Sequence, residues 1–157
     1  QGHQDALLRT EYAVKTITDA GIQMEKLAGD TANWHRSQAA TKMTQWLQVY
    51  GDKIELVLSN NDDMAIGAID AYEGASKPLP AVVGIDATTL AIEALKEGKL
   101  LGTVKNDAQK QAELIFMLSY QLVTNTYLQE DIDITKQKYF FTEYTMIQPK
   151  DVLKKSE

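Results

Sequence analysis

The chain of 157 residues contains no cysteine, so disulfides, thiolate catalysis and Cys-based zinc sites are excluded together. No apolar run approaches the roughly 20 residues that a membrane-spanning helix needs. Basic residues cluster only in the tail, at Lys150, Lys154 and Lys155, and the formal net charge is −6. Phosphate binding requires clustered Lys and Arg, so this charge balance disfavours a nucleic-acid surface.

Catalytic and cofactor motifs are missing as well. The two histidines, His3 and His35, have no partners at the spacing of a metal site. The chain contains neither of the two phosphate-binding loop motifs, G-x-x-x-x-G-K-[ST] and G-x-G-x-x-G. No residue stands as a nucleophile or proton donor beside a partner. We therefore expect neither an enzyme nor a cofactor.

Three short polar loops, each between an apolar run and a helical pattern, carry most of the information in the chain. These are 59–62 after the run 54–58, Asp86 after 81–85, and Asn106 with Asp107 after 102–104. A repeated strand, polar tip and helix predicts an α/β fold with an open parallel sheet flanked by helices. The tips of parallel strands meet at one edge, where open α/β sheets bind ligands.

Apolar spacing predicts the other elements. A helix should begin at once with Asp5 as its N-cap, and Pro149 fits the first turn of a last helix. Residues 127–136 should form a polar connector. Further helices are expected around 39–50, 65–72, 90–95 and 108–123, and further strands at 22–27 and 138–147.

The polar residues at the tips have two interpretations. Any one of them could simply cap a helix, but several on one edge favour a shared ligand. Asp5 and Arg9, four residues apart, are either a surface pair or, with His3, part of the same edge. Trp34 lies in a loop and has less reason to be core than Trp46, which lies on an apolar helix face. Amides, carboxylates and a flat aromatic ring together suit a neutral polyol.

Five segments then resemble, in order, the second half of the periplasmic glucose/galactose-binding proteins of the type I periplasmic binding protein family. They are 2–10 (GHQDALLRT), 30–34 (DTANW), 59–68 (SNNDDMAIGA), 83–87 (VGIDA) and 102–108 (GTVKNDA). These relatives serve ABC-type sugar importers and, in some bacteria, chemotaxis. The segment 59–68 alone would fit sugar-binding proteins and repressor sensor domains alike, whereas the His-x-Asp-x-x-x-Arg opening and the Trp loop indicate the glucose/galactose branch.

The resemblance implies a set of sugar-binding residues. Trp34 would stack on one face of the sugar ring, and Asn60, Asp62 and Asp107 would be caps or would support their neighbours. The residues that would contact glucose or galactose are His3, Asp5, Arg9, Trp34, Asn61, Asp86 and Asn106. The partners implied are a monosaccharide and the membrane permease of an ABC importer. The protein would be exported, either periplasmic or a membrane-anchored lipoprotein. Calcium would be bound only in a full-length protein, through Glu55 and an upstream loop.

The same resemblance implies an incomplete lobe. Residues 1–107 would form the C-terminal sugar-binding lobe without its first strand, 108–141 would belong to the N-terminal lobe, and 142–157 would be a hinge crossing and tail. We therefore expect a fragment that is poorly stable and binds sugar weakly or not at all. Its gap would be filled by a second copy of the chain or by the tail strand 138–147.

Two other classes of function stay open at this point. A sugar-sensing domain of a lactose-repressor-type regulator would need a basic helix-turn-helix upstream. An enzyme acting on a sugar has less support, because the sequence offers no nucleophile beside a base.

Overall fold

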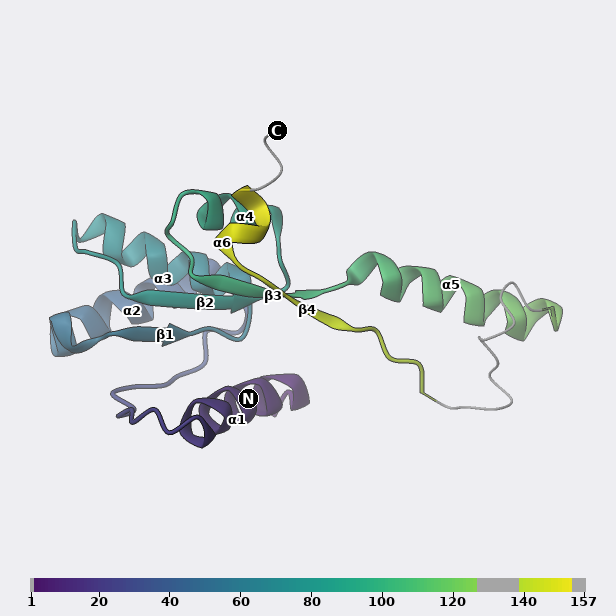
Figure 1. The fold of residues 1–157 in the computed structure, drawn as a ribbon, viewed down its shortest axis with the longest axis horizontal. Coiled ribbons are helices and arrows are strands. Elements are labelled where there is room, and N and C mark those ends of the chain that lie inside the picture. The colour runs from purple at the N-terminus through teal and green to yellow at the C-terminus, as the bar shows by residue number, and fades with distance from the viewer. Residues whose placement is uncertain (1, 127–138, 154–157) are drawn as a thin grey trace. The chain divides into compact units, whose positions relative to one another are not determined.

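The computed structural model describes residues 2–126 and 139–153, which divide into two compact units. The first unit comprises residues 1–104 and 146–157, and the second comprises 105–145. Figure 1 shows the elements. They are α1 (Gln4–Asp19), α2 (Arg36–Tyr50), the short 3-10 helix η1 (Gly51–Lys53), β1 (Leu56–Leu58), α3 (Asp62–Gly74), β2 (Ala81–Ile85), α4 (Thr89–Lys96), β3 (Gly102–Asn106), α5 (Ala108–Thr124), β4 (Tyr144–Ile147) and α6 (Pro149–Leu153).

The sheet has the strand order β1-β2-β3-β4. β1 pairs with β2, and β2 pairs with β3, in parallel, with Val57 opposite Val82 and Gly84 opposite Thr103. Each of these strands is followed by a helix, so the predicted α/β fold with an open, mainly parallel sheet is confirmed (Figure 1). The carboxyl ends of β1 and β2 therefore lie at one edge of the first unit.

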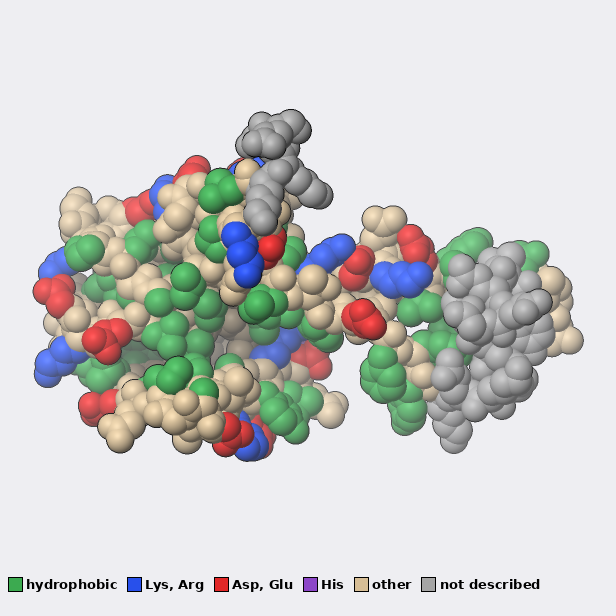
Figure 2. Space-filling view, in the orientation of Figure 1, with side chains coloured by type: hydrophobic (Ala, Val, Ile, Leu, Met, Phe, Trp, Pro, Cys, Tyr) green, Lys and Arg blue, Asp and Glu red, His purple; other side chains and the backbone are tan. Residues whose placement is uncertain are grey.

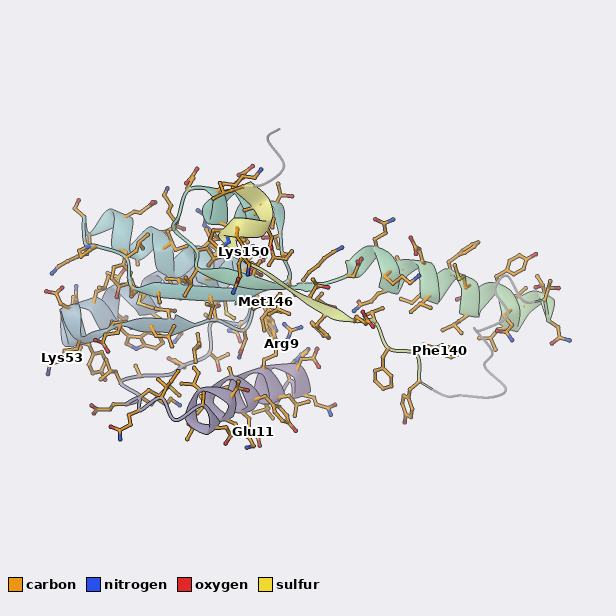
Figure 3. All side chains as sticks on the ribbon, viewed as in Figure 1. Arg9, Glu11, Lys53, Phe140, Met146 and Lys150 are labelled. Atoms are coloured by element: carbon orange, nitrogen blue, oxygen red, sulfur yellow. The ribbon has the colours of Figure 1, made fainter. Side chains whose placement is uncertain are left out.

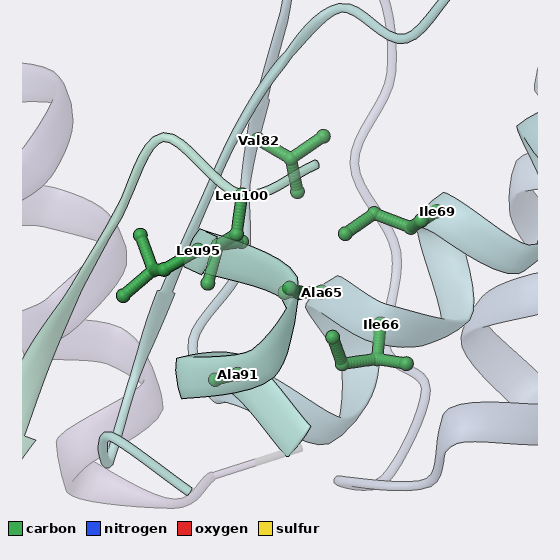
Figure 4. Packing of buried hydrophobic residues seen from close by; sticks show 8 residues of the cluster. Ala65, Ile66, Ile69, Val82, Ala91, Leu95 and Leu100 are labelled. Atoms are coloured by element: carbon green, nitrogen blue, oxygen red, sulfur yellow. The ribbon is translucent and has the colours of Figure 1, made fainter. Parts of the chain in front are cut away.

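The main core of the first unit lies between β2, α3 and α4. β2 alternates, so that Val82 and Gly84 are buried. Val82 packs with Ile69 of α3 and Leu95 of α4, as Figure 4 shows. Each helix thus buries one apolar face against β2, with Ala65 and Ile69 on α3 and Ala91 and Leu95 on α4.

A second core cluster joins α2 to α3. Met43 of α2 packs with Tyr72 of α3, and Trp46 packs against the cluster, as its helical position indicated. The two helices approach closely at Gly67, where an added Cβ would lie 2.2 Å from the carbonyl oxygen of Arg36. Only glycine leaves room for this contact, so Gly67 fixes how α2 and α3 pack.

Two expectations at the start of the chain are wrong. Residues 22–27 do not form a strand, and Ile22 is 59% exposed. A strand needs a neighbour for its hydrogen bonds, and β1, the outer strand of the described sheet, pairs only with β2. Asp5 is not an N-cap either, because α1 begins at Gln4 and His3 occupies the N-cap position, without a side-chain cap bond.

The strand expected at 138–147 is shorter in the structure. β4 covers Tyr144–Ile147, residues 139–143 form no strand, and residue 138 lies outside the described residues, as does the connector expected at 127–136. β4 is placed next to β3, at the opposite end of the sheet from β1. Ile147 packs there against the main core, so the tail strand does not fill a gap beside β1. Filling by a second copy stays a prediction, as does the low stability of the chain.

Apolar side chains lie on the surface of the first unit. α1 has no buried residue, and its Leu7 is 62% exposed. Leu56 and Leu58 of β1 are each 38% exposed. Figure 2 shows such side chains over β1 and α1. α1 is therefore held to the rest of its unit chiefly by polar contacts, which are described below.

The second unit contains α5. The Asp107 side chain caps this helix by accepting a hydrogen bond from the Lys110 N–H at 3.0 Å. Asp107 is thus a cap, as the resemblance implied. The division into 1–107, 108–141 and 142–157 stays a prediction.

Substitution of two adjacent leucines, one buried and one exposed, tests where the main core lies. Leu100 is 1% exposed and packs in the core, whereas Leu101 is 57% exposed. Leu100→Ala should lower the free energy of unfolding by about 2–5 kcal/mol, because it removes packed methyl groups and leaves a cavity. Leu101→Ala should change it by about 0.5 kcal/mol or less. Urea unfolding followed by circular dichroism measures both, and equal losses would contradict this description of the core.

Candidate functional site

Helix α1 is tied to the loop that follows β1. The Asn60 side-chain amide donates to the Thr10 hydroxyl at 2.8 Å and to the Ala6 carbonyl at 3.2 Å. In return the Arg9 guanidinium donates to the Asn60 carbonyl at 2.8 Å. Figure 3 shows Arg9 on the side of α1 that faces the sheet and Glu11 on the opposite side. These bonds place the first turns of α1 at the carboxyl edge of β1.

Arg9 also faces the loop that follows β2. Its Nη1 lies 4.0 Å from Oδ1 of Asp86, and the two side chains are 15% and 34% exposed. This separation allows ion pairing but is longer than a hydrogen bond. The guanidinium carbon lies 5.9 Å from the centre of the Trp34 ring, within range of a cation–π contact. Arg9 therefore connects α1, the Trp loop and the tip of β2.

Trp34 is placed by an unusual turn. Asn33 and Trp34 have φ values of +50° and +66°, in the left-handed region. The His3 ring meets the Trp34 ring edge-on, with centroids 5.2 Å apart and planes at 75°. The Asn61 side-chain amide donates to the Trp34 carbonyl at 3.4 Å, while its Oδ1 accepts from the Met64 N–H at 3.0 Å. Asn61 thus caps α3 and also holds the Trp loop.

A cavity of about 280 Å³ lies between α1 and the Trp loop. Of the predicted sugar-binding residues it includes His3 and Trp34, whereas Arg9, Asn61 and Asp86 lie outside its lining. It is lined by Gly2, His3, Ala6, Leu7, Thr10, Asp30, Thr31, Ala32, Asn33, Trp34, Asn60 and Met64. His3 and Trp34 therefore border this cavity, whereas Arg9 and Asn61 contact Trp34 from outside its lining.

Five of the seven predicted residues are joined by these contacts, and two are not. Asp5 lies in the first turn of α1 and takes part in none of the contacts described above. Asn106 ends β3 in the second unit, where its Oδ1 accepts a hydrogen bond from the Gln111 side-chain amide at 2.7 Å. The role of all seven in sugar binding stays a prediction.

Calcium does not fit the described residues by themselves. Glu55 is an exposed residue just before β1, and it offers one carboxylate, whereas Ca²⁺ takes about six to eight oxygen ligands. Among residues 2–126 and 139–153, no three His, Asp or Glu side chains are grouped as a metal site requires. Calcium binding through Glu55 in a longer protein stays a prediction.

The consecutive residues 60–62 have three different structural roles, which the sequence did not distinguish. Asn60 anchors α1 through both its side chain and its carbonyl, and Asn61 is the cap of α3. Asp62 is fully buried and caps neither α3 nor α4. The sequence carries no signal for this division, because it depends on where α1 and the β2 loop lie in space.

Comparison with known proteins assigns the family. A family model described as the periplasmic binding protein domain matches residues 1–126. The chain therefore belongs to the periplasmic binding protein family. No described helix is long and apolar enough to cross a membrane.

The relatives include proteins that are named for binding different polyols. The D-galactose/methyl-galactoside binding periplasmic protein MglB of Haemophilus influenzae is 39% identical over 122 residues, which are 77% of this chain and 37% of that protein. A xylitol-binding protein of Mycolicibacterium smegmatis is 42% identical over 77 residues, 49% of this chain and 22% of that protein. An ABC transporter solute-binding protein of Bacillus halodurans, solved with bound myo-inositol, is 34% identical with a TM-score of 0.81, covering 98% of this chain and 50% of that one.

The chain thus spans half or less of the length of these relatives. They are named as solute-binding proteins and not as enzymes or regulators. This agrees with the expectation of a sugar-binding transport protein and does not favour the alternative of a lactose-repressor-type sensor.

Asp62 predicts how stability should depend on pH. Burial raises the pKa of the Asp62 carboxyl above its ordinary value of 3.8, although bonds from Thr103 and Thr88 act in the opposite direction. The Asp62 carboxyl group therefore binds its proton more tightly in the folded state than in the unfolded state. The stability that Asp62 contributes is therefore fully present below the unfolded pKa and is lost as pH rises through the raised, folded pKa.

The measurement compares the parent protein with Asp62→Asn, which does not titrate. The difference in free energy of unfolding, parent minus variant, should fall as pH rises from about 3 to about 7. Urea titrations at several pH values give this difference. A difference that increases with pH would show that the carboxylate is stabilised, not penalised, by its surroundings.

Proposed function

We propose that the protein binds a neutral hexose, glucose or galactose, as the solute-binding subunit of an ABC importer. The observation that carries the proposal is the set of contacts around Arg9, which bring Asp86 within 4.0 Å and the Trp34 ring within 5.9 Å of one guanidinium. A charged donor, a charged acceptor and an aromatic face are the groups that recognise a sugar ring.

The chemistry favours an uncharged ligand with several hydroxyl groups. Arg9 donates, the Asp86 carboxylate accepts, and the Asn61 amide does both, so vicinal hydroxyls can be bound through either role. Arg9 and Asp86 carry opposite charges and face each other, so this pair by itself does not call for an ionic ligand. Such a site rejects analogues that leave its polar groups unpaired.

The relatives support the same ligand class but differ in the ligand that their names carry. They are described as binding a galactoside, xylitol or myo-inositol, all neutral polyols. Galactose agrees with MglB, and glucose with the resemblance described above. Passage of the sugar to a membrane permease, and export to the periplasm or to a lipoprotein anchor, form part of the proposal and follow from the family alone.

Removal of either charged group should abolish tight binding. Asp86→Ala or Arg9→Ala should weaken the affinity for the sugar by roughly 2–5 kcal/mol, because the partner charge is left without its counterpart in a partly desolvated site. Isothermal titration calorimetry with glucose, galactose, xylitol and myo-inositol, on the protein as its gene encodes it, measures this loss and ranks the ligands.

The chain offers a matched control. Arg36 and Asp70 form a bidentate pair at 2.6 and 2.7 Å between α2 and α3, with 45% and 36% exposure. Arg36→Ala and Asp70→Ala remove the same residue types and should leave the sugar affinity unchanged. Near-parental affinity in Asp86→Ala and Arg9→Ala would reject the site, and binding of none of the four polyols would reject the function.

A further inference from the structure

The turn that presents Asp86 has a strained backbone. Asp86 has a φ of +118° and Ala87 a φ of +54°, so two successive residues with side chains occupy conformations that L-residues rarely adopt. Such conformations persist only where the surroundings hold them. The direction of the Asp86 carboxylate depends on this turn, because the side chain projects from the first strained residue.

Three successive backbone N–H groups hold the turn. The Asp86 N–H donates to the Val104 carbonyl at 2.8 Å and so continues the pairing of β2 with β3. The Ala87 N–H donates to the Thr103 hydroxyl at 3.2 Å, and the Thr88 N–H donates to Oδ2 of Asp62 at 2.8 Å. The turn is thus fixed beyond its strand by two side chains, Asp62 and Thr103.

These two side chains form one buried unit. The Thr103 hydroxyl donates to Oδ1 of Asp62 at 2.7 Å, and the two residues are 2% and 0% exposed. An added Cβ at Gly84 would lie 2.2 Å from the same Oδ1, so only glycine admits the carboxylate at this point. Asp62 is therefore enclosed by β2 and β3 and cannot itself touch a ligand.

A capping role does not explain Asp62. α3 is capped by Asn61, and α4 is capped by the Thr88 hydroxyl, which accepts from the Ala91 N–H at 3.3 Å. A buried carboxylate is costly unless its bonds are satisfied. The bonds that Asp62 makes are directed to the Thr88 backbone and to Thr103, both of which border the strained turn.

We infer that Asp62 and Thr103 are positioning residues, which fix the turn 86–88 and thereby aim the Asp86 carboxylate at the sugar. The consequence for affinity rests on the proposed function. The claim that Asp62 and Thr103 hold the turn does not rest on the proposed function, because it concerns the protein without ligand.

The test removes the hydroxyl of Thr103 while keeping the size and shape of the side chain. Thr103→Val has nearly the same shape but cannot donate to Asp62 or accept from the Ala87 N–H, whereas Thr103→Ser keeps the hydroxyl. In Thr103→Val we expect the sugar affinity to fall by about tenfold or more, since two buried polar groups lose their partner. In Thr103→Ser it should stay within about threefold, because the same bonds can form.

A readout without ligand accompanies the calorimetry. Hydrogen exchange of the Ala87 and Thr88 amides, followed by NMR, should be at least about tenfold faster in Thr103→Val than in the parent, and close to the parent in Thr103→Ser. Ile69→Val, a core change away from the turn, serves as the control for general destabilisation. It should lower stability without changing the sugar affinity.

Each outcome has a defined meaning. Equal sugar affinities in Thr103→Val and Thr103→Ser, or unchanged exchange at Ala87 and Thr88 in Thr103→Val, would overturn the inference. An affinity loss in Ile69→Val as large as that in Thr103→Val would overturn it too, because destabilisation alone would then suffice. If the parent protein binds no polyol, the proposed function fails, while the exchange comparison still decides whether the pair holds the turn.

Discussion

Parallel pairing of β1, β2 and β3 is the constraint on which the candidate site depends. Because the strands run in the same direction, the loops after β1 and β2 emerge at one edge, and Asn60 and Asp86 come within reach of the same helix. In an antiparallel arrangement these loops would lie at opposite ends of the sheet. The short strands are sufficient for this purpose because the core of Val82, Ile69 and Leu95 fixes the helices that follow them.

Polar groups, rather than apolar packing, attach α1 to this edge. None of its residues is buried, yet Arg9 and Thr10 are bonded to Asn60, and Arg9 also faces Asp86. The groups that hold the helix in place therefore include a group proposed to bind the ligand.

The buried Asp62 supports the candidate binding edge from the interior of the first unit. Its carboxylate is enclosed between β2 and β3, its pKa is raised by burial, and its two oxygens accept from Thr103 and Thr88. The free-energy cost of burying this group is offset by bonds that keep the turn of Asp86 in a strained shape. The same small cluster of Asp62 and Thr103 thus bears on stability and, under the proposed function, on ligand recognition.

The sequence by itself determined the succession of strand, polar tip and helix, since apolar periodicity is a local property. β2 and α2 to α6 follow from it. Tertiary structure decided the rest. Residues 22–27 were expected to form a strand, but within the described chain they have no neighbour to pair with. The run 60–62 divides into an anchor, a cap and a buried support, because three similar side chains meet three different surroundings that are brought together only when the sheet forms.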